Sequence, residues 1–175
     1  VLGIGDDAAL IKATDNTELA ISTDTLVCGK HFFVDADPYK LGYKSLAVNL
    51  SDMAAMGAKP RWVLLALTLP DNLVQHNKAW LSEFSAGFFA LADSHQVELI
   101  GGDTTSGPLS IGVQIIGEVE VGKALRRSGA KLDDDIWISG RLGDAALALN
   151  HELHQITLEP NEIAESLPAL LTPAA

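Results

Sequence analysis

The feature that most constrains the fold is a continuous apolar run from Trp62 to Leu69, which lies between two segments with helical patterning. A run of this length suits a strand that is buried on both faces of a sheet. The preceding helix is predicted over about Tyr39 to Met56. Asp37-Pro38 supplies its N-terminal cap and a first-turn proline, and Gly57 follows its end. A buried strand next to a helix of this kind indicates an α/β sheet.

A second helix is predicted from a cap at Asp71 or Asn72 to about Ser94. Its apolar face consists of Trp80, Phe84, Phe88 and Leu91. Two strands follow, a short one over Val97 to Ile100 and a longer one over Leu109 to Val119. Alternate residues of a strand share a face, so the side chains predicted to point toward the core are Ile111, Val113 and Ile115.

The N-terminal region contributes further strands. Ala8 to Ala13 and Glu18 to Ser22 are apolar runs on either side of a turn signal, so we expect a hairpin. Val27 to Val34 is a weaker strand candidate. The order of these elements predicts an α/β (α+β) fold, in which a mixed β-sheet carries helices packed on one face.

The character of the sequence changes near Val121 to Gly129, where glycines and basic residues form a link. A new strand is predicted over Lys131 to Ser139 and a new helix over Leu142 to about Leu153. We therefore predict an N-terminal domain over residues 1–121, followed over residues 122–175 by a linker and the beginning of a second α/β domain. The chain opens without methionine, directly before a glycine motif, so we expect it to be a piece of a longer protein.

The charge and composition of the chain argue against several classes of function. The formal net charge is −11 and no large Lys/Arg cluster is present, so we expect no binding to nucleic acid. No apolar run approaches the roughly 20 residues that span a bilayer, so we expect no membrane association. The single cysteine, Cys28, fits a reducing compartment, and we expect a cytoplasmic protein. A nucleotide would need divalent cations between itself and this acidic chain.

Acidic residues beside glycines, small residues or hydroxyls are the main clue to function. They are Asp6 and Asp7 in GIGDDAAL, Asp24 in STDTL, Asp52 in NLSDMAAMGA and Asp103 in GGDTT. Carboxylate and hydroxyl oxygens suit Mg²⁺ and the phosphates that it bridges. STDTL and GGDTT both follow apolar strands, and ligands favour strand ends in α/β sheets. Each stretch by itself is also typical of a turn or a cap.

Asp52 has the most unusual surroundings of these acidic residues. Ser45, Asn49 and Asp52 share one face of their helix, while the apolar stripe consists of Leu46, Leu50, Met53 and Ala54. A carboxylate in a stretch almost free of other charge is costly to bury unless it is paired or bound to a metal ion. The alternative is a partly exposed aspartate near the C-terminus of the helix.

Other motifs are rejected or are not assigned a role on their own. GIGDDA resembles a dinucleotide fingerprint, but a strand is expected after it and two carboxylates would repel a pyrophosphate. The chain has no P-loop motif, and His151 and His154 lack the spacing of a zinc helix. His31 and the pair Arg126-Arg127 are typical of structural or solvated groups, although arginine suits phosphate. No catalytic residue is assigned.

Taken together, the motifs resemble those of the thiamine-monophosphate kinase family. The resemblance covers most of Leu2 to Leu149, and the segments that carry it are, in order, GIGDDAAL, LAISTDTLVCGKHF, GYKSLAVNLSDMAAMGAKPRW, LLALTLP, ELIGGDTTSGPLSI, GEVEVGKALRRSGAK and DDDIWISGRLGDAALAL. The wider superfamily includes the aminoimidazole ribonucleotide synthetase and selenophosphate synthetase enzymes. The resemblance implies ATP-dependent phosphorylation of thiamine monophosphate to thiamine diphosphate, by direct transfer with several Mg²⁺ ions.

The resemblance also implies roles for individual residues. The implied Mg²⁺ ligands are Asp7, Asp24, Asp52 and Asp103, with further oxygens from Ser22 and Thr23. The implied contacts to ATP are Gly102, Asp103 and Arg127, and the implied contact to thiamine monophosphate is His31. Members of the superfamily pair through the sheet of this domain, so a homodimer with a barrel across its interface is expected.

The chain departs from the family pattern at Ser106, where arginine is frequent, and at His95, where a tyrosine often lies. It shows neither the acidic DxSDG-type motif nor the glutamate of the family's second domain, so we expect little kinase activity from this chain alone. Two alternatives remain open. One is another enzyme of the same superfamily, and the other is a non-catalytic module that dimerises and binds nucleotide.

Overall fold

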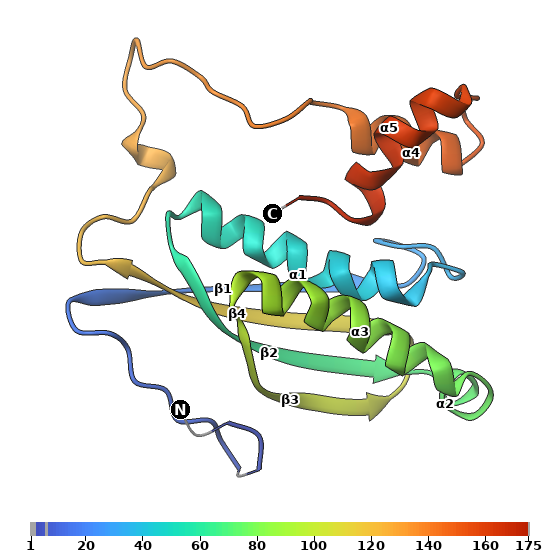
Figure 1. Ribbon diagram of the computed structural model, residues 1–175, viewed down its shortest axis with the longest axis horizontal. Helices are drawn as coiled ribbons and strands as arrows, with labels where there is room; N and C mark the ends of the chain where they lie inside the picture. Colours follow the sequence, from blue (N-terminus) through green and yellow to red (C-terminus); the bar gives the residue numbers. More distant parts are fainter. Residues whose placement is uncertain (1–2, 6, 175) are drawn as a thin grey trace. The chain divides into compact units, whose positions relative to one another are not determined.

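The computed structural model describes residues 3–5 and 7–174 of the chain. Its contacts divide the chain into two compact units, Val1–Leu125 and Arg126–Ala174. The first unit contains an open β-sheet with helices, and the second contains short helices (Figure 1). Within the described residues, no helix is long and apolar enough to cross a membrane.

The sheet of the first unit has the strand order β1-β4-β2-β3. Its strands are β1 (Thr17–Val27), β2 (Lys59–Leu69), β3 (Glu98–Ser106) and β4 (Ser110–Glu120). β4 is antiparallel to both β1 and β2, whereas β2 is parallel to β3. The predicted mixed sheet is confirmed, and β1 and β3 form its edges.

Two long helices, α1 (Pro38–Ala55) and α3 (Lys78–His95), lie over one face of this sheet (Figure 1). The predicted start of α1 is confirmed, because the Asp37 side chain accepts a hydrogen bond from the Lys40 N–H at 2.9 Å. Its predicted end is confirmed as well, since Gly57 has a φ of +65° just beyond the last turn.

The prediction of a single helix from Asp71 to Ser94 is wrong. A short helix, α2 (Asp71–His76), precedes α3, and Asn77 separates the two. The Asn77 side chain accepts a hydrogen bond from the Trp80 N–H at 3.2 Å and so caps α3. Asparagine at an N-cap starts a new helix, and this local hydrogen bond overrides the continuous apolar pattern.

The core of the first unit lies between the sheet and the two long helices. The buried face predicted for α3 is confirmed by Trp80, Phe84, Phe88 and Leu91, and that of β4 by Ile111, Val113 and Ile115. The centroids of the Trp80 and Phe84 rings lie 5.2 Å apart in a stacked arrangement. In α1 the predicted apolar stripe is correct for Leu46, Leu50 and Met53, but Ala54 is exposed.

Several strand boundaries differ from the prediction. Ala8 to Ala13 forms no strand, so the hairpin is absent. β1 continues to Val27 because β4 pairs with it along its whole length, and Cys28 to Val34 forms turns rather than a strand. β3 runs through the GGDTT stretch, which we expected to follow a strand, because β2 pairs with it as far as Ser106.

The prediction that β2 is buried on both faces holds only in part. Toward the helices, the buried side chains are Val63, Leu67 and Leu69. On the opposite face, Trp62 is buried in a cluster with Ile100 and Ile116, whereas Ala66 is exposed. Ala9 and Ile11 pack against this cluster. We call their segment, residues 3–5 and 7–14, the N-terminal arm, and the remainder of this sheet face is the open face.

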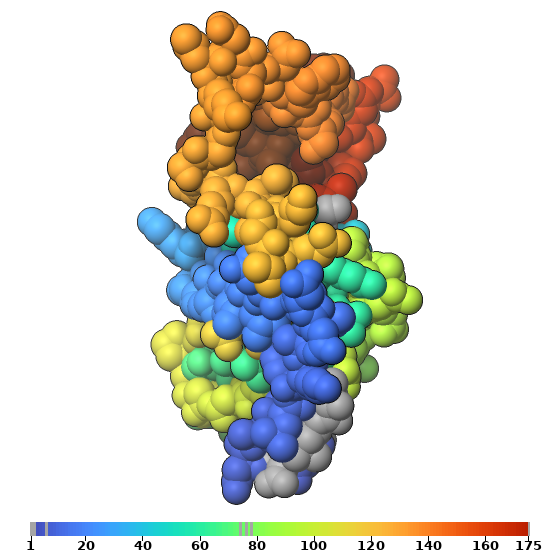
Figure 2. Space-filling model, turned by 90° about the vertical axis from the view of Figure 1, so that its left-hand side faces the viewer, coloured from blue at the N-terminus to red at the C-terminus, as the bar shows by residue number. Residues whose placement is uncertain are grey.

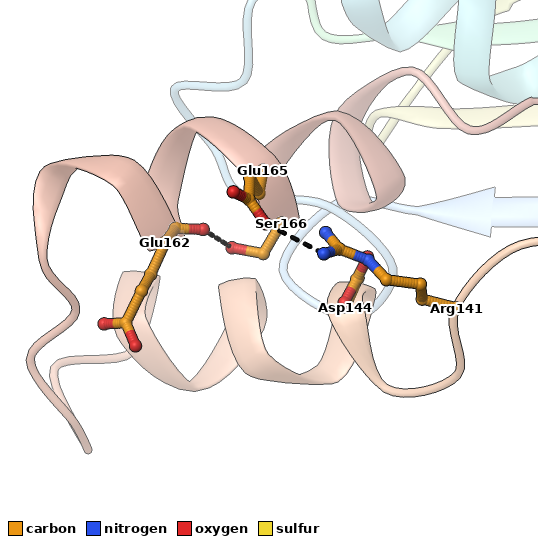
Figure 3. Close-up of polar contacts among 5 residues, drawn as sticks. All are labelled: Arg141, Asp144, Glu162, Glu165 and Ser166. Atoms are coloured by element: carbon orange, nitrogen blue, oxygen red, sulfur yellow. Dashed lines mark hydrogen bonds and ion pairs between the residues drawn. The ribbon is translucent and has the colours of Figure 1, made fainter.

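In the second unit an exposed arginine forms ion pairs with two helices, α4 (Asp144–Glu152) and α5 (Pro160–Leu171). Arg141 Nε lies 3.0 Å from Asp144 Oδ2, and Arg141 Nη1 lies 2.8 Å from Glu165 Oε2 (Figure 3). The Ser166 hydroxyl donates to the Glu162 carbonyl oxygen at 2.7 Å. The helix predicted near α4 is confirmed, whereas α5 is not among the predicted elements.

The strand predicted over Lys131 to Ser139 is not present in the structure. Its apolar side chains are highly exposed, with Ile136 at 95% and Trp137 at 88%. The only regular element between Arg126 and Asp144, within the described residues, is a single 3₁₀ turn, η1 (Arg127–Gly129). A strand needs a partner for its backbone groups, and no neighbouring strand pairs with this segment in the part of the chain that the structure describes.

Close contact between α1 and α3 depends on glycine. A Cβ atom at Gly87 would lie 1.9 Å from the carbonyl oxygen of Tyr39. We predict that Gly87→Ala lowers the free energy of unfolding by about 1–3 kcal/mol or more, because the helices must move apart. Urea unfolding followed by circular dichroism measures this change.

The matched control is Gly129→Ala, because a Cβ atom at Gly129 would meet nothing within 4 Å. This variant is expected to change the free energy of unfolding by no more than about 0.5 kcal/mol. Equal unfolding midpoints for Gly87→Ala and the unmodified chain would contradict the proposed role of this glycine.

Candidate functional site

A cleft of about 950 Å³ lies on the open face of the sheet in the first unit. The N-terminal arm and all four strands contribute to its walls. Its polar side chains include Asp7, Thr23, Thr25, Asp103, Thr104 and Gln114. The cleft therefore brings together residues from opposite ends of the first unit, including three of the predicted metal ligands.

Gly102 lies in the wall of this cleft and has a structural reason to be glycine. Its φ is +152°, and a Cβ atom there would lie 1.9 Å from the carbonyl oxygen of Leu65 in the neighbouring strand. No side chain fits between β3 and β2 at this point. The backbone of Gly102 is consequently bare toward the cleft, which permits close approach of a ligand.

A second polar group lies on the other side of β1, toward α1. The Ser22 hydroxyl donates to Asp52 Oδ2 at 2.5 Å and so connects the edge strand to the last turns of the helix. Asp24 has the same orientation as Ser22, because it is two residues further along β1. Thr23, between them, faces the cleft. Successive residues of STDTL therefore face opposite sides of the sheet: Ser22 and Asp24 face α1, and Thr23 faces the cleft.

The charges of this second group repel one another. The pKa of Asp24 is raised, first by burial and then by the negative charge of Asp52, while His31 acts in the opposite direction. Ionisation of Asp24 is thus more costly in the folded chain than in the unfolded chain. A cation between the two carboxylates would remove this cost, which favours a metal or ammonium ligand at this position.

His31 lies in the turn that follows β1. The Val27 N–H donates to its Nδ1 at 3.0 Å. Nδ1 is therefore the acceptor, and in the neutral ring Nε2 carries the proton. This hydrogen bond orients the exposed imidazole, and its influence on the pKa of Asp24 places it in the same electrostatic environment as that carboxylate.

The four aspartates predicted as ligands do not converge on a single point in this chain. Asp7 and Asp103 line the cleft, whereas Asp24 and Asp52 interact on the other side of β1. In residues 3–5 and 7–174, no group of three or more His, Cys, Asp or Glu side chains is arranged to hold a metal ion. Asp6 lies outside the described residues, and Arg127 belongs to η1 of the second unit.

Ser45 and Asn49, predicted to share a face with Asp52, are fully buried, whereas Asp52 is half-buried. Ser45 donates to the Gly42 carbonyl oxygen at 2.8 Å, and the Asn49 amide donates to the Ser45 carbonyl oxygen at 2.9 Å. Within the described residues, Asn49 Oδ1 has no hydrogen-bond partner. These two side chains belong to the helix interior and not to the charged group.

Three polar residues of the cleft, Thr25, Thr104 and Gln114, were not among the predicted site residues. Thr25 continues the alternation that begins at Thr23, and Gln114 is the polar residue in the apolar strand SIGVQII. Both signals are present in the sequence. A period of two along β1 and an isolated polar residue in β4 indicate the side of the sheet that a ligand can reach.

Comparison with known proteins decides the family. Residues 5–119 match the family described as AIR synthase related protein, N-terminal domain. The chain belongs to this family. The predicted resemblance to thiamine-monophosphate kinases is confirmed: this AIR synthase related chain is 56% identical to the thiamine-monophosphate kinase of Escherichia coli (strain K12) over 148 residues, which are 85% of the chain and 44% of that relative.

Solved structures agree with the match to the AIR synthase related family. The thiamine-monophosphate kinase of Stenotrophomonas maltophilia K279a superposes with a TM-score of 0.89 at 48% identity, over 99% of this chain and 55% of that one. AaThiL complexed with AMPPCP and TMP superposes with a TM-score of 0.84 at 31% identity, over 94% of this chain and 52% of that one. The chain thus spans about half the length of these relatives.

The repulsion across β1 and α1 leads to a direct prediction. Asp52→Asn removes a negative charge near Asp24 and keeps an oxygen that can accept from Ser22, so it is expected to lower the pKa of Asp24. Carbon-13 NMR titration of the aspartate carboxyl groups measures this pKa. Asp93 is an exposed residue of α3, and the control Asp93→Asn is expected to leave the pKa of Asp24 unchanged. An Asp24 pKa that does not respond to Asp52→Asn would show that the two carboxylates do not interact.

Proposed function

We propose that this chain forms the nucleotide- and metal-binding part of a thiamine-monophosphate kinase, which uses ATP to phosphorylate thiamine monophosphate to thiamine diphosphate. The observation that carries the proposal is the 56% identity to the Escherichia coli kinase over 148 residues. AaThiL, complexed with AMPPCP and TMP, provides further support. The single cysteine, Cys28, fits a reducing compartment, and we propose the cytoplasm as the location.

The residues present fit Mg²⁺ as the metal. Their oxygens come from carboxylates and hydroxyls, and the pKa of Asp24, raised by burial and then by the charge of Asp52, supports a cation at this position. We assign one ion to the set Asp24, Asp52 and Ser22, and another to Asp7 and Asp103, with Thr23 on the opposite edge strand as a more distant oxygen of the same cleft. Bound Mg²⁺ would neutralise charge on the phosphate oxygens, which is the main requirement of phosphoryl transfer.

The remaining assignments rest on the resemblance to the kinase family and on the chemistry of each residue. The bare backbone of Gly102, beside Asp103, suits the close approach of an ATP phosphate in the cleft. Arg127 is assigned to ATP because a guanidinium group can hold a phosphate with two parallel hydrogen bonds. His31 is assigned to thiamine monophosphate, since its Nε2 is free of the backbone bond that occupies Nδ1 and can donate to a phosphate oxygen.

We also propose that the chain forms a homodimer through its sheet, with a barrel across the interface. On β1, Leu19 and Ile21 are 41% and 60% exposed, and a second copy would cover them. Light scattering, which measures the mass of the particle in solution, tests for this homodimer.

In the second unit, the exposed Ile136 and Trp137 support the proposal that this region begins a further α/β domain.

The metal assignment predicts the effect of changing a cleft carboxylate. Asp103→Asn is expected to weaken binding of Mg·AMPPCP about tenfold or more, roughly 1.4 kcal/mol. Isothermal titration calorimetry measures the dissociation constant, with Asp93→Asn as a control of equal charge change outside the cleft lining. Equal losses of affinity in the two variants would show that net charge alone causes the effect. That result would contradict the assignment of Asp103 to a metal ion.

A phosphoryl-transfer assay tests the proposed reaction. The chain is incubated with Mg·ATP and thiamine monophosphate, or with aminoimidazole ribonucleotide precursors or selenide in its place, and products are separated by chromatography. Thiamine diphosphate is the expected product, at a low rate. Faster turnover of another acceptor would favour a different enzyme of the superfamily. Binding of Mg·AMPPCP by a dimer that forms no product would favour the non-catalytic module.

A further inference from the structure

The N-terminal arm forms one wall of the cleft although it belongs to no strand. Figure 2 shows the dark blue N-terminal residues running down the viewer's side of the first unit. Gly3 lies against the backbone of Ile100, and Ile11 packs against the cluster around Trp62. Between these contacts, Asp7 and Ala8 line the cleft. The position of Asp7 therefore depends on what holds the arm to the sheet.

A carboxylate holds the end of the arm. Glu118 of β4 is only 8% exposed, and both of its oxygens accept hydrogen bonds from Thr14. Oε1 accepts from the Thr14 backbone N–H at 2.6 Å, and Oε2 accepts from the Thr14 hydroxyl at 2.9 Å. Thr14 lies three residues before the start of β1, so this two-point contact fixes the chain where it leaves the sheet face.

The buried carboxylate is stabilised in its charged form. Thr14 is the main cause of a lowered pKa for Glu118, and Arg61 adds to the effect, with its Nε 3.5 Å from Oε2. The Arg61 guanidinium group also lies over the Trp62 ring, 5.5 Å from its centroid. The same apolar cluster that holds Ile11 thus supports the partner of Glu118.

We propose that Glu118 is a positioning residue for the cleft. By holding Thr14, it keeps the N-terminal arm against the open face of the sheet and so keeps Asp7 in the cleft wall. Glu118 itself is absent from the residues that line the cleft. The role of Asp7 toward Mg²⁺ rests on the proposed function, whereas the attachment of the arm does not.

Hydrogen exchange measured by mass spectrometry on the full 175-residue chain tests the attachment. Glu118→Gln removes the charge that strengthens both hydrogen bonds and is expected to speed exchange in the arm about tenfold. Glu120→Gln, an exposed change on the same strand, is expected to leave the arm unchanged. Thr14→Val removes the hydroxyl donor and is also expected to speed exchange in the arm. Thr14→Ser keeps both donors and is expected to leave exchange as slow as in the unmodified chain.

A double-mutant cycle with Mg·AMPPCP tests the positioning role. Glu118→Gln is expected to weaken binding about tenfold, and Asp7→Asn is expected to cost much less in the Glu118→Gln background than in the unmodified chain. Asp52→Asn, on the other face of the sheet, is expected to lower the affinity by the same factor in both backgrounds. If Glu118 only stabilised the fold, the Glu118→Gln background would change the affinity lost at Asp7 and at Asp52 alike.

The two measurements separate the possible failures. Unchanged exchange of the arm in Glu118→Gln and Thr14→Val would overturn the attachment, whatever the ligand. Faster exchange combined with additive effects of Asp7→Asn and Glu118→Gln would overturn the positioning role. If the unmodified chain does not bind Mg·AMPPCP, the proposed function fails and with it the role of Asp7, while the exchange data still decide whether Glu118 holds the arm.

Discussion

The alternation of side chains along β1 is the constraint on which the candidate site depends. Ser22 and Asp24 face α1, while Thr23 and Thr25 face the cleft, since successive residues of a strand point to opposite sides. One short stretch of sequence therefore supplies oxygen atoms to both sides of an edge strand. Asp24 and Asp52 therefore meet between β1 and α1, whereas Asp7 and Asp103 line the cleft on the other face of the sheet.

Rigid packing holds this unfavourable arrangement of charge in place. Asp24 and Asp52 repel one another, yet α1 cannot move away from the sheet without losing its contact with α3. That contact is close enough that a Cβ atom at Gly42 would lie 2.0 Å from the Phe84 carbonyl oxygen. A well-packed core can maintain locally costly groups, and such groups are typical of ligand sites.

The sequence predicted those features that depend on local interactions. Asp37 and Gly57 defined α1, and the aromatic spacing on α3 defined its buried face. Non-local features were harder to predict. β3 is longer than its apolar residues suggest because β2 supplies hydrogen bonds to GGDTT, and the separation of the aspartates depends on which face of the sheet each one reaches. The hydrogen bonds between Thr14 and Glu118 join residues 104 positions apart and have no local signal.

We propose that two sets of carboxylates, one on each face of the sheet, hold separate cations. Anomalous X-ray scattering from crystals grown with Mn²⁺ and AMPPCP tests it most directly, because Mn²⁺ accepts the same oxygen ligands as Mg²⁺. One anomalous peak is expected beside Asp24 and Asp52 and another beside Asp7 and Asp103. Peaks that lie away from both sets, or nucleotide bound with no metal at either, would contradict it.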